Sequence, residues 1–151
     1  KKEQLTPERL VRLNNLGFIW DLVNHNWETG FKNLVAYKEE FGNCDVTGTF
    51  KYNNYKLGSW VGYQRRVKLT RKQSDRLNEL GFVWDPVSFH WETGFNNLIA
   101  YKKEFGDCIV LQRFKYNDYA LGIWVHKQRL GKLTPEQWDR LNHLGFVWKA
   151  K

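Results

Sequence analysis

A tandem repeat of about 64 residues constrains the fold of this chain more than any other feature. Tryptophans recur at this interval, in the pairs Trp27 and Trp91, Trp60 and Trp124, and Trp84 and Trp148. Aligned without a gap, residues 21–84 and 85–148 are identical at about 41 of 64 positions. Such self-similarity indicates an array of two like units, each with its own core, and argues against a single larger domain.

The first twenty residues contain part of a third copy. The segments Leu5–Arg9 and Leu16–Trp20 parallel the end of the repeat, Leu69–Trp84. We therefore expect residues 1–20 to be a partial repeat and residues 27–84 and 91–148 to be complete ones. Because the chain begins at Lys1 and contains no Met, we also expect it to be a fragment of a longer array.

Each complete repeat begins with a pattern of apolar residues at helical spacing. The residues of this face in the first copy are Trp27, Phe31, Leu34, Val35 and Phe41. Apolar residues three, four and seven positions apart lie on one side of a helix. Gly42 follows and is expected to end this first helix in a left-handed conformation.

A loop over residues 43–54 separates the first helix from the second. Val46 and Phe50 are expected to insert into the core from this loop, and Asn53 or Asn54 to cap the second helix. The second helix is predicted over residues 55–66. Its inward face carries Leu57, Trp60, Val61 and Gln64. We expect Gln64 to satisfy buried backbone groups. Gly58 on this helix predicts a close approach to another helix.

The third helix has the clearest start signal. Thr70 and Gln73, like Thr134 and Gln137 in the second copy, fit a capping box. Gly81 is expected to end the helix, after which Phe82 and Trp84 fold back onto the bundle. The predicted fold is all-α, with two tandem three-helix bundles preceded by an orphan third helix from a preceding repeat.

Residues suited to catalysis or to metal binding are few. The four histidines, at positions 25, 90, 126 and 143, occupy no matching sites in the two copies, and no glycine-rich phosphate loop occurs. Cys44 and Cys108 have no metal-ligand spacing and are interpreted as small buried thiols. We expect no enzymatic activity, no catalytic residues, no metal and no cofactor.

Hydropathy gives no sign of a membrane protein. No window of the sequence approaches 18 consecutive apolar residues, and the N-terminus lacks the pattern of a secretory signal. The sequence therefore predicts a protein without a membrane span, located inside the cell, in the cytoplasm or the nucleus.

Positive charge is concentrated in one region of the repeat. The chain carries a formal net charge of +8, and residues 46–72 contain seven Lys and Arg residues with no Asp or Glu. The matching segment 110–136 contains five Lys and Arg residues against two acids. With the outward Tyr63, the candidate nucleic-acid-binding residues are Lys51, Lys56, Tyr63, Arg65, Arg66, Lys68, Arg71, Lys72, Arg113, Lys115, Lys127, Arg129 and Lys132.

A basic surface repeated on the same part of each unit is typical of nucleic-acid-binding modules, since Lys and Arg neutralise phosphates. We expect DNA in preference to RNA as the partner, bound through the basic loop and second helix. The same residues could be only a solvated helix face. Tyr52 and Tyr116 are interpreted as packing residues and not as base-stacking platforms.

A protein-interaction or scaffolding array is the alternative function. Repeat proteins often display an extended surface to a protein partner. Ile123 and Leu130 fall on the outward side of the second helix in the second copy, where exposed apolar residues favour this alternative.

The motifs resemble the helicase-associated domain family. The resemblance rests on the pattern Leu57-Gly58-x-Trp60-Val61-x-x-Gln64-Arg65 and on Leu80-Gly81-Phe82-x-Trp84, which both recur in the second copy. It implies a short three-helix module in tandem copies with a proposed nucleic-acid-binding role, and a helicase motor or another protein partner elsewhere in the parent chain. No ATPase activity is implied for this segment. Family members often carry Val-Pro where this chain has Val46-Thr47.

Overall fold

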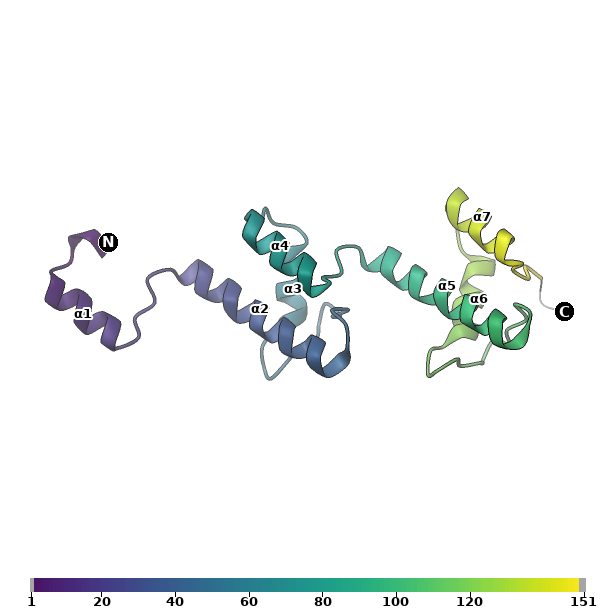
Figure 1. The fold of residues 1–151 in the computed structure, drawn as a ribbon, viewed down its shortest axis with the longest axis horizontal. Coiled ribbons are helices and arrows are strands. Elements are labelled where there is room, and N and C mark those ends of the chain that lie inside the picture. The colour runs from purple at the N-terminus through teal and green to yellow at the C-terminus, as the bar shows by residue number, and fades with distance from the viewer. Residues whose placement is uncertain (1, 150–151) are drawn as a thin grey trace. The chain divides into compact units, whose positions relative to one another are not determined.

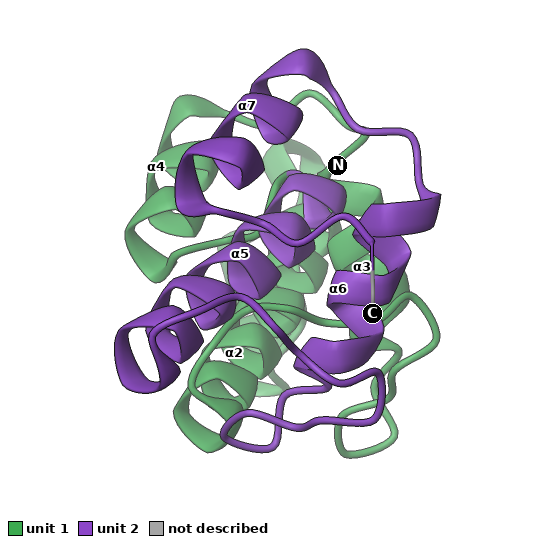
Figure 2. Ribbon diagram, turned by 90° about the vertical axis from the view of Figure 1, so that its right-hand side faces the viewer, with its two compact units in different colours: residues 1–84 green, residues 85–151 purple. Residues whose placement is uncertain are grey.

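The computed structural model describes residues 2–149 and is helical throughout its regular elements (Figure 1). The elements are η1 (Lys2–Gln4), α1 (Pro7–Asn15), α2 (Leu22–Phe41), α3 (Leu57–Gln64), α4 (Arg71–Leu80), α5 (Pro86–Phe105), α6 (Leu121–Leu130) and α7 (Pro135–Leu144). Two compact units, residues 1–84 and 85–151, divide the chain (Figure 2). Helices α2 to α4 form the repeat of the first unit and α5 to α7 that of the second, which confirms the all-α fold with three helices per repeat.

The first helix of each repeat is longer than its apolar pattern predicts. Helix α2 begins five residues before Trp27 because the side chain of Asp21 accepts a hydrogen bond from the Asn24 backbone N–H, at 2.9 Å. Helix α5 begins in the same way after Asp85, with Pro86 at its first position. Gly42 ends α2 with φ of +80°, as predicted.

The start of the second helix differs from the prediction. Asn53 and Asn54 do not cap α3; they have φ of +46° and +65° and form a tight turn. Across this turn, Tyr52 and Tyr55 exchange two backbone hydrogen bonds of 2.8 Å. Asn tolerates the left-handed region, so the pair closes a turn where a helix cap was expected. Helix α3 therefore starts at Leu57 and covers only Leu57–Gln64.

The third helix forms as predicted. Thr70 and Thr134 accept hydrogen bonds from the backbone of Gln73 and Gln137, whose side chains in turn accept from the threonine backbone N–H groups. Gly81, with φ of +82°, then ends α4. Phe82 is buried behind it, whereas Trp84 rests edge-on against Phe82 and stays 40% exposed.

Helix α1 is the counterpart of α4 and α7 without the rest of a repeat. Thr6 caps it and Gly17 follows with φ of +74°, as in the complete repeats. No residue of α1 is buried, and Phe18 is 51% exposed where its counterpart Phe82 is 6% exposed. Local signals are therefore enough to form this helix, whereas its apolar face is buried only where the rest of a repeat is present.

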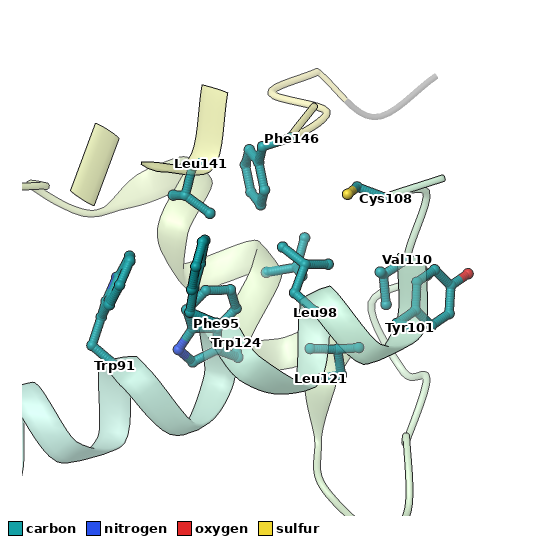
Figure 3. Close-up of a cluster of buried hydrophobic side chains, with 11 residues drawn as sticks. Trp91, Phe95, Leu98, Tyr101, Cys108, Val110, Leu121, Trp124, Leu141 and Phe146 are labelled. Atoms are coloured by element: carbon teal, nitrogen blue, oxygen red, sulfur yellow. The ribbon is translucent and has the colours of Figure 1, made fainter. Parts of the chain in front are cut away.

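Each repeat has an aromatic core, shown for the second unit in Figure 3. Helix α5 contributes a row of side chains, Trp91, Phe95, Leu98 and Tyr101, and Leu141 and Phe146 cover it from the C-terminal part of the unit. Trp91 stacks on Phe95 with ring centroids 5.0 Å apart. Trp27 and Phe31 repeat this pair in the first unit, at 5.1 Å. Burial of such rings supplies most of the apolar contact in a module this small.

Two glycines per repeat make close packing possible. A Cβ built on Gly30 would lie 2.1 Å from the Trp60 ring, so this glycine lets the indole of α3 lie on the backbone of α2. Gly58 was expected to allow a helix to approach; a Cβ there would instead meet the backbone of the preceding loop, 2.1 Å from the Thr47 carbonyl oxygen. The prediction of a close contact at Gly58 is correct, but the partner is the loop.

The buried glutamine and the cysteines lie within the core of each repeat. Gln64 donates a hydrogen bond to the Trp60 carbonyl oxygen at 3.2 Å, as the prediction of a backbone partner requires. It also accepts a hydrogen bond from Trp27 Nε1 at 3.2 Å, which the sequence did not predict. Cys44 and Cys108 are free buried thiols, 1% exposed, which confirms their interpretation. Tyr52 is half-buried and donates its hydroxyl to Glu40 at 2.9 Å, consistent with a packing role.

Candidate functional site

Most of the predicted binding residues are exposed side chains on one part of each repeat. They come from the turn before the second helix, the second helix, the following loop and the start of the third helix. The exposed members are Lys51, Lys56, Tyr63, Arg66, Lys68, Arg71, Lys72, Arg113, Lys115, Lys127 and Lys132. Among them, Arg71 lies 4.0 Å from Asp75, with both side chains largely solvated. The geometry thus leaves these cations available to a partner.

Arg65 is different, because it is half-buried and its guanidinium packs against the core. Its Nε donates to the Val83 carbonyl oxygen at 2.8 Å, and its guanidinium carbon lies 5.5 Å from the centroid of the Phe82 ring. The Nη2 atom is buried and has no hydrogen-bond partner within residues 2–149. Burial lowers the pKa of this guanidinium. Arg65, one of the candidate nucleic-acid-binding residues, thus uses its guanidinium for contacts within its own repeat.

Arg129 repeats the arrangement in the second unit. Its Nε donates to the Val147 carbonyl oxygen at 2.9 Å, and its guanidinium lies 5.8 Å from the Phe146 ring centroid. The sequence motif Gln-Arg, recurring in both copies, marks a pair of structural residues. Only the three-dimensional fold separates Arg65 from its exposed neighbour Arg66.

A groove of about 370 Å³ lies beside the exposed cations of the first unit. Helix α2 contributes Val23, Asn26 and Trp27; the turn before α3 contributes Tyr55; α3 contributes Trp60, Tyr63 and Gln64; the loop after α3 contributes Val67, Lys68 and Leu69; and α4 contributes Gln73. We call this set the repeat groove. Its volume falls in the range of about 300–1,000 Å³ that is usual for small-molecule sites.

The second unit contains the same groove, of about 510 Å³. Every residue of the first groove has its counterpart 64 positions later in the second, and eight of the eleven pairs are the same residue type. The pairs that differ are Asn26 and His90, Tyr63 and Lys127, and Val67 and Gly131. A hollow formed by equivalent residues in both repeats is a property of the repeat itself.

The repeat groove holds polar groups that the fold does not use. Gln73 uses its Oε1 in the capping box, and within residues 2–149 its amide nitrogen has no hydrogen-bond partner. Within residues 2–149 the Tyr55 hydroxyl likewise has no hydrogen-bond partner, and burial raises the pKa of Tyr55. Gln137 and Tyr119 repeat both features in the second unit. These groups can donate to a ligand.

No acidic residue lines either groove. The nearby Glu28 is engaged by Arg76, and this hydrogen bond holds the pKa of Glu28 below its usual value, with smaller contributions from Lys32 and Lys72. By contrast, a hollow against α7 is lined by Glu136 and Asp139 as well as Arg140. The repeat groove is therefore both duplicated and free of carboxylates.

The sequence did not predict the groove. Trp27 and Trp60 belong to the predicted apolar faces, Lys68 to the predicted binding residues and Gln73 to the capping box, and Leu69 has no predicted role. The available signal was that all five positions recur in the second copy, three of them outside the apolar stripes. That they enclose one hollow depends on the packing of three helices.

Metal and membrane features are not found in the part of the chain that the structure describes. Residues 2–149 contain no group of three or more His, Cys, Asp or Glu side chains that could hold a metal ion. None of the helices described there is both long and apolar enough to cross a bilayer.

Comparison with protein families assigns the chain. The model of the helicase associated domain matches twice, over residues 24–85 and 88–149. No curated protein matches. No solved structure matches either. The two matches span nearly all of each structural repeat, from the third residue of its first helix to beyond the end of its capped third helix, and they are the basis for the assignment. The chain belongs to the helicase associated domain family and carries two copies of the domain.

Proposed function

We propose that the chain is a non-catalytic accessory module that binds nucleic acid, through phosphate contacts of the basic loop and second helix in each repeat. The observation that carries the proposal is that both repeats expose Lys and Arg on equivalent elements. Lys51, Lys68, Lys115 and Lys132 are two equivalent pairs, all exposed. Cations on one surface bind the phosphate backbone and release its counterions.

The phosphate contacts are assigned to the exposed cations only. Arg65 and Arg129 are left out because each donates to a backbone carbonyl within its own repeat. Their neighbours Arg66 and Lys127 are exposed and extend toward solvent. Non-specific binding of this kind depends on the number of phosphates neutralised and not on base sequence.

A non-catalytic role is supported by the lack of repeated chemistry. The histidines differ between copies, and both thiols are buried with raised pKa values, the result of burial. A nucleophilic thiol needs access to solvent and a nearby base. Both cysteines are buried, and no histidine occupies matching positions in the two copies. We propose that catalysis, such as that of a helicase motor, is supplied by another part of the parent protein, acting inside the cell on DNA in preference to RNA.

A salt titration tests the proposal. Binding of labelled DNA, followed by fluorescence anisotropy, should weaken steeply with salt, with a log-log slope of about −3 to −4.5 for four or five phosphate contacts. Substituting Lys51, Lys56, Arg66 and Lys68 together with Ala should reduce both the affinity and the slope. Binding that is independent of salt, or absent at low salt, would overturn the proposal.

A matched control separates a local surface from total charge. Arg9, Arg12, Lys32 and Lys103 are exposed cations outside the predicted interface. Their joint replacement by Ala removes the same formal charge. It should lower affinity less than the interface variant; an equal loss would indicate that only net charge matters.

A protein-interaction array is the second candidate. Ile123 and Leu130 on α6 are 50% and 75% exposed, and scattered apolar residues of this kind can anchor a protein partner. The two candidates differ in their response to salt and nuclease. A partner protein retained at high salt after nuclease treatment, and lost in an I123S/L130S variant, would favour the interaction array.

A further inference from the structure

We propose that each repeat groove holds one unstacked base of a single-stranded DNA, with an adjacent phosphate on the lysine at its edge. This inference rests on the proposed nucleic-acid binding and extends it from the phosphates to the bases. It predicts that the module prefers single strands to duplexes and that the two repeats bind one base each.

Aromatic rings supply the first part of the argument. Trp27 and Trp60 both line the first groove, with ring centroids 6.0 Å apart and planes tilted by 56°. Trp91 and Trp124 line the second with the same spacing and tilt. In Figure 3, Trp91 lies at one end of the buried cluster, beside Phe95. Trp27, Trp91 and Trp124 are only 6–8% exposed, so the indoles form the apolar floor of each groove. Tyr63, 57% exposed, adds an exposed ring to the first groove, and a base can stack on such a ring with little dependence on sequence.

The polar groups of the groove fit the edge of a base. The Tyr55 hydroxyl and the Gln73 amide nitrogen have no hydrogen-bond partner within residues 2–149, and both line the groove. Base edges present carbonyl oxygens and ring nitrogens that accept hydrogen bonds. Because the Oε1 of Gln73 is held by the capping box, its amide group is pre-positioned on α4.

Charge complementarity places the backbone of the strand. Lys68 and its counterpart Lys132 are exposed and line the two grooves, and neither groove contains a carboxylate. In the second groove Lys127 takes the place of Tyr63 and adds a second cation. An anionic strand can therefore pass the opening while a base enters it.

The apolar lining favours an unpaired deoxynucleotide. A paired base is stacked on both faces, so only an unpaired one can enter a hollow between side chains without the energy of unpairing. Val23 and Leu69 line the groove beside Lys68. Neither of these two side chains can hydrogen-bond a ribose 2′-hydroxyl, so they provide no contact that would select RNA.

The test compares two oligonucleotides with the same number of phosphates. One is a short oligothymidine, and the other has the same length with every base replaced by an abasic site. Using the whole chain, we expect anisotropy to show affinity at least about fivefold higher for the oligothymidine, the lower end of base–aromatic stacking. The ratio of the two affinities cancels the phosphate contribution.

Two charge-matched variants locate the effect. N26E/H90E places a carboxylate at an exposed groove position in each repeat, and N24E/N96E places one at an exposed position of the same two helices, outside the groove. Both variants add the same formal charge. The ratio should fall toward one in N26E/H90E and remain near the wild-type value in N24E/N96E, with circular dichroism showing that both are folded.

Each outcome distinguishes the two proposals. Equal binding of the two oligonucleotides, with a steep salt dependence, would overturn the groove inference and leave phosphate binding intact. No binding of either at low salt would overturn both. Two further results would overturn the assignment of the groove to single-stranded DNA. One is an affinity for duplex DNA equal to that for the oligothymidine. The other is an oligouridine-to-abasic affinity ratio as large as the oligothymidine-to-abasic ratio.

Discussion

Arg76 of α4 is clamped to Glu28 of α2 by two hydrogen bonds, from Nη1 at 2.5 Å and from Nη2 at 3.0 Å. The guanidinium carbon also lies 4.1 Å from the centroid of the Phe31 ring. Arg140 and Glu92 repeat the pair in the second unit. This ion pair connects the third helix to the first, across the same face that carries the stacked Trp and Phe rings.

Removing Arg76 should destabilise the first repeat. R76A loses a partly solvated ion pair and a cation–π contact, together about 1–3 kcal/mol, after allowing for the roughly one-third exposure of both side chains. E28Q keeps the ring contact and should cost less, about 0.5–1 kcal/mol. Urea unfolding followed by circular dichroism measures both. Equal costs for the two variants would show that the ring contact contributes nothing.

The same pairs predict a pH dependence of stability. Hydrogen bonds from Arg76 and Arg140 lower the pKa values of Glu28 and Glu92 in the fold. Their contribution is therefore fully present above the unfolded value of about 4.3 and is lost as pH falls through the lower folded values. The difference in unfolding free energy between the wild type and E28Q/E92Q should shrink below about pH 4. A constant difference down to pH 2 would contradict this assignment.

Arg65 and Arg66 should separate stability from binding. R65A removes the hydrogen bond to the Val83 carbonyl and the contact with Phe82, and should cost about 1–2 kcal/mol. R66A removes an exposed side chain and should change stability by less than about 0.5 kcal/mol while weakening DNA binding. Thermal unfolding and anisotropy measure the two effects. A destabilised R66A would show that the contacts of this neighbouring pair are misassigned.

Gly30 and Gly62 should respond oppositely to alanine. G30A places a Cβ 2.1 Å from the Trp60 ring, so the indole must move, and we expect a loss of about 2 kcal/mol or more. Gly62 lies within α3 with nothing within 4 Å of a built Cβ, so G62A should stabilise by up to about 1 kcal/mol. Chemical denaturation compares them. A neutral G30A would contradict the close Trp60 contact.

Cys44 and Cys108 should be unreactive in the folded protein. Each is 1% exposed, and burial raises the pKa of both thiols. A disulfide reagent at pH 8 should therefore modify them slowly under native conditions and rapidly in denaturant. Absorbance of the released thiolate reports the rate. Rapid modification of the native protein would mean that the loop carrying Cys44 opens readily.

The sequence predicted the elements that depend on local signals. The capping boxes at Thr70 and Thr134 and the glycine at position 42 each act within a few residues, so they could be recognised without knowledge of the fold. The duplication itself defined the two units. Predictions failed where a short motif has two local solutions, as at Asn53 and Asn54, whose side chains suit a left-handed turn as well as a helix cap.

The tertiary structure decided which of the basic residues are exposed. Arg65 and Arg66 are adjacent and chemically identical, yet one donates to the Val83 carbonyl and the other is exposed. Likewise, Trp27, Leu69 and Gln73 line one groove only because α2, α3 and α4 bring them together. Local sequence determines helix ends and apolar faces, because these arise from nearby hydrogen bonds and periodicity. Contacts between residues 18 to 48 positions apart arise from packing. Packing therefore determined both the half-buried arginine and the groove.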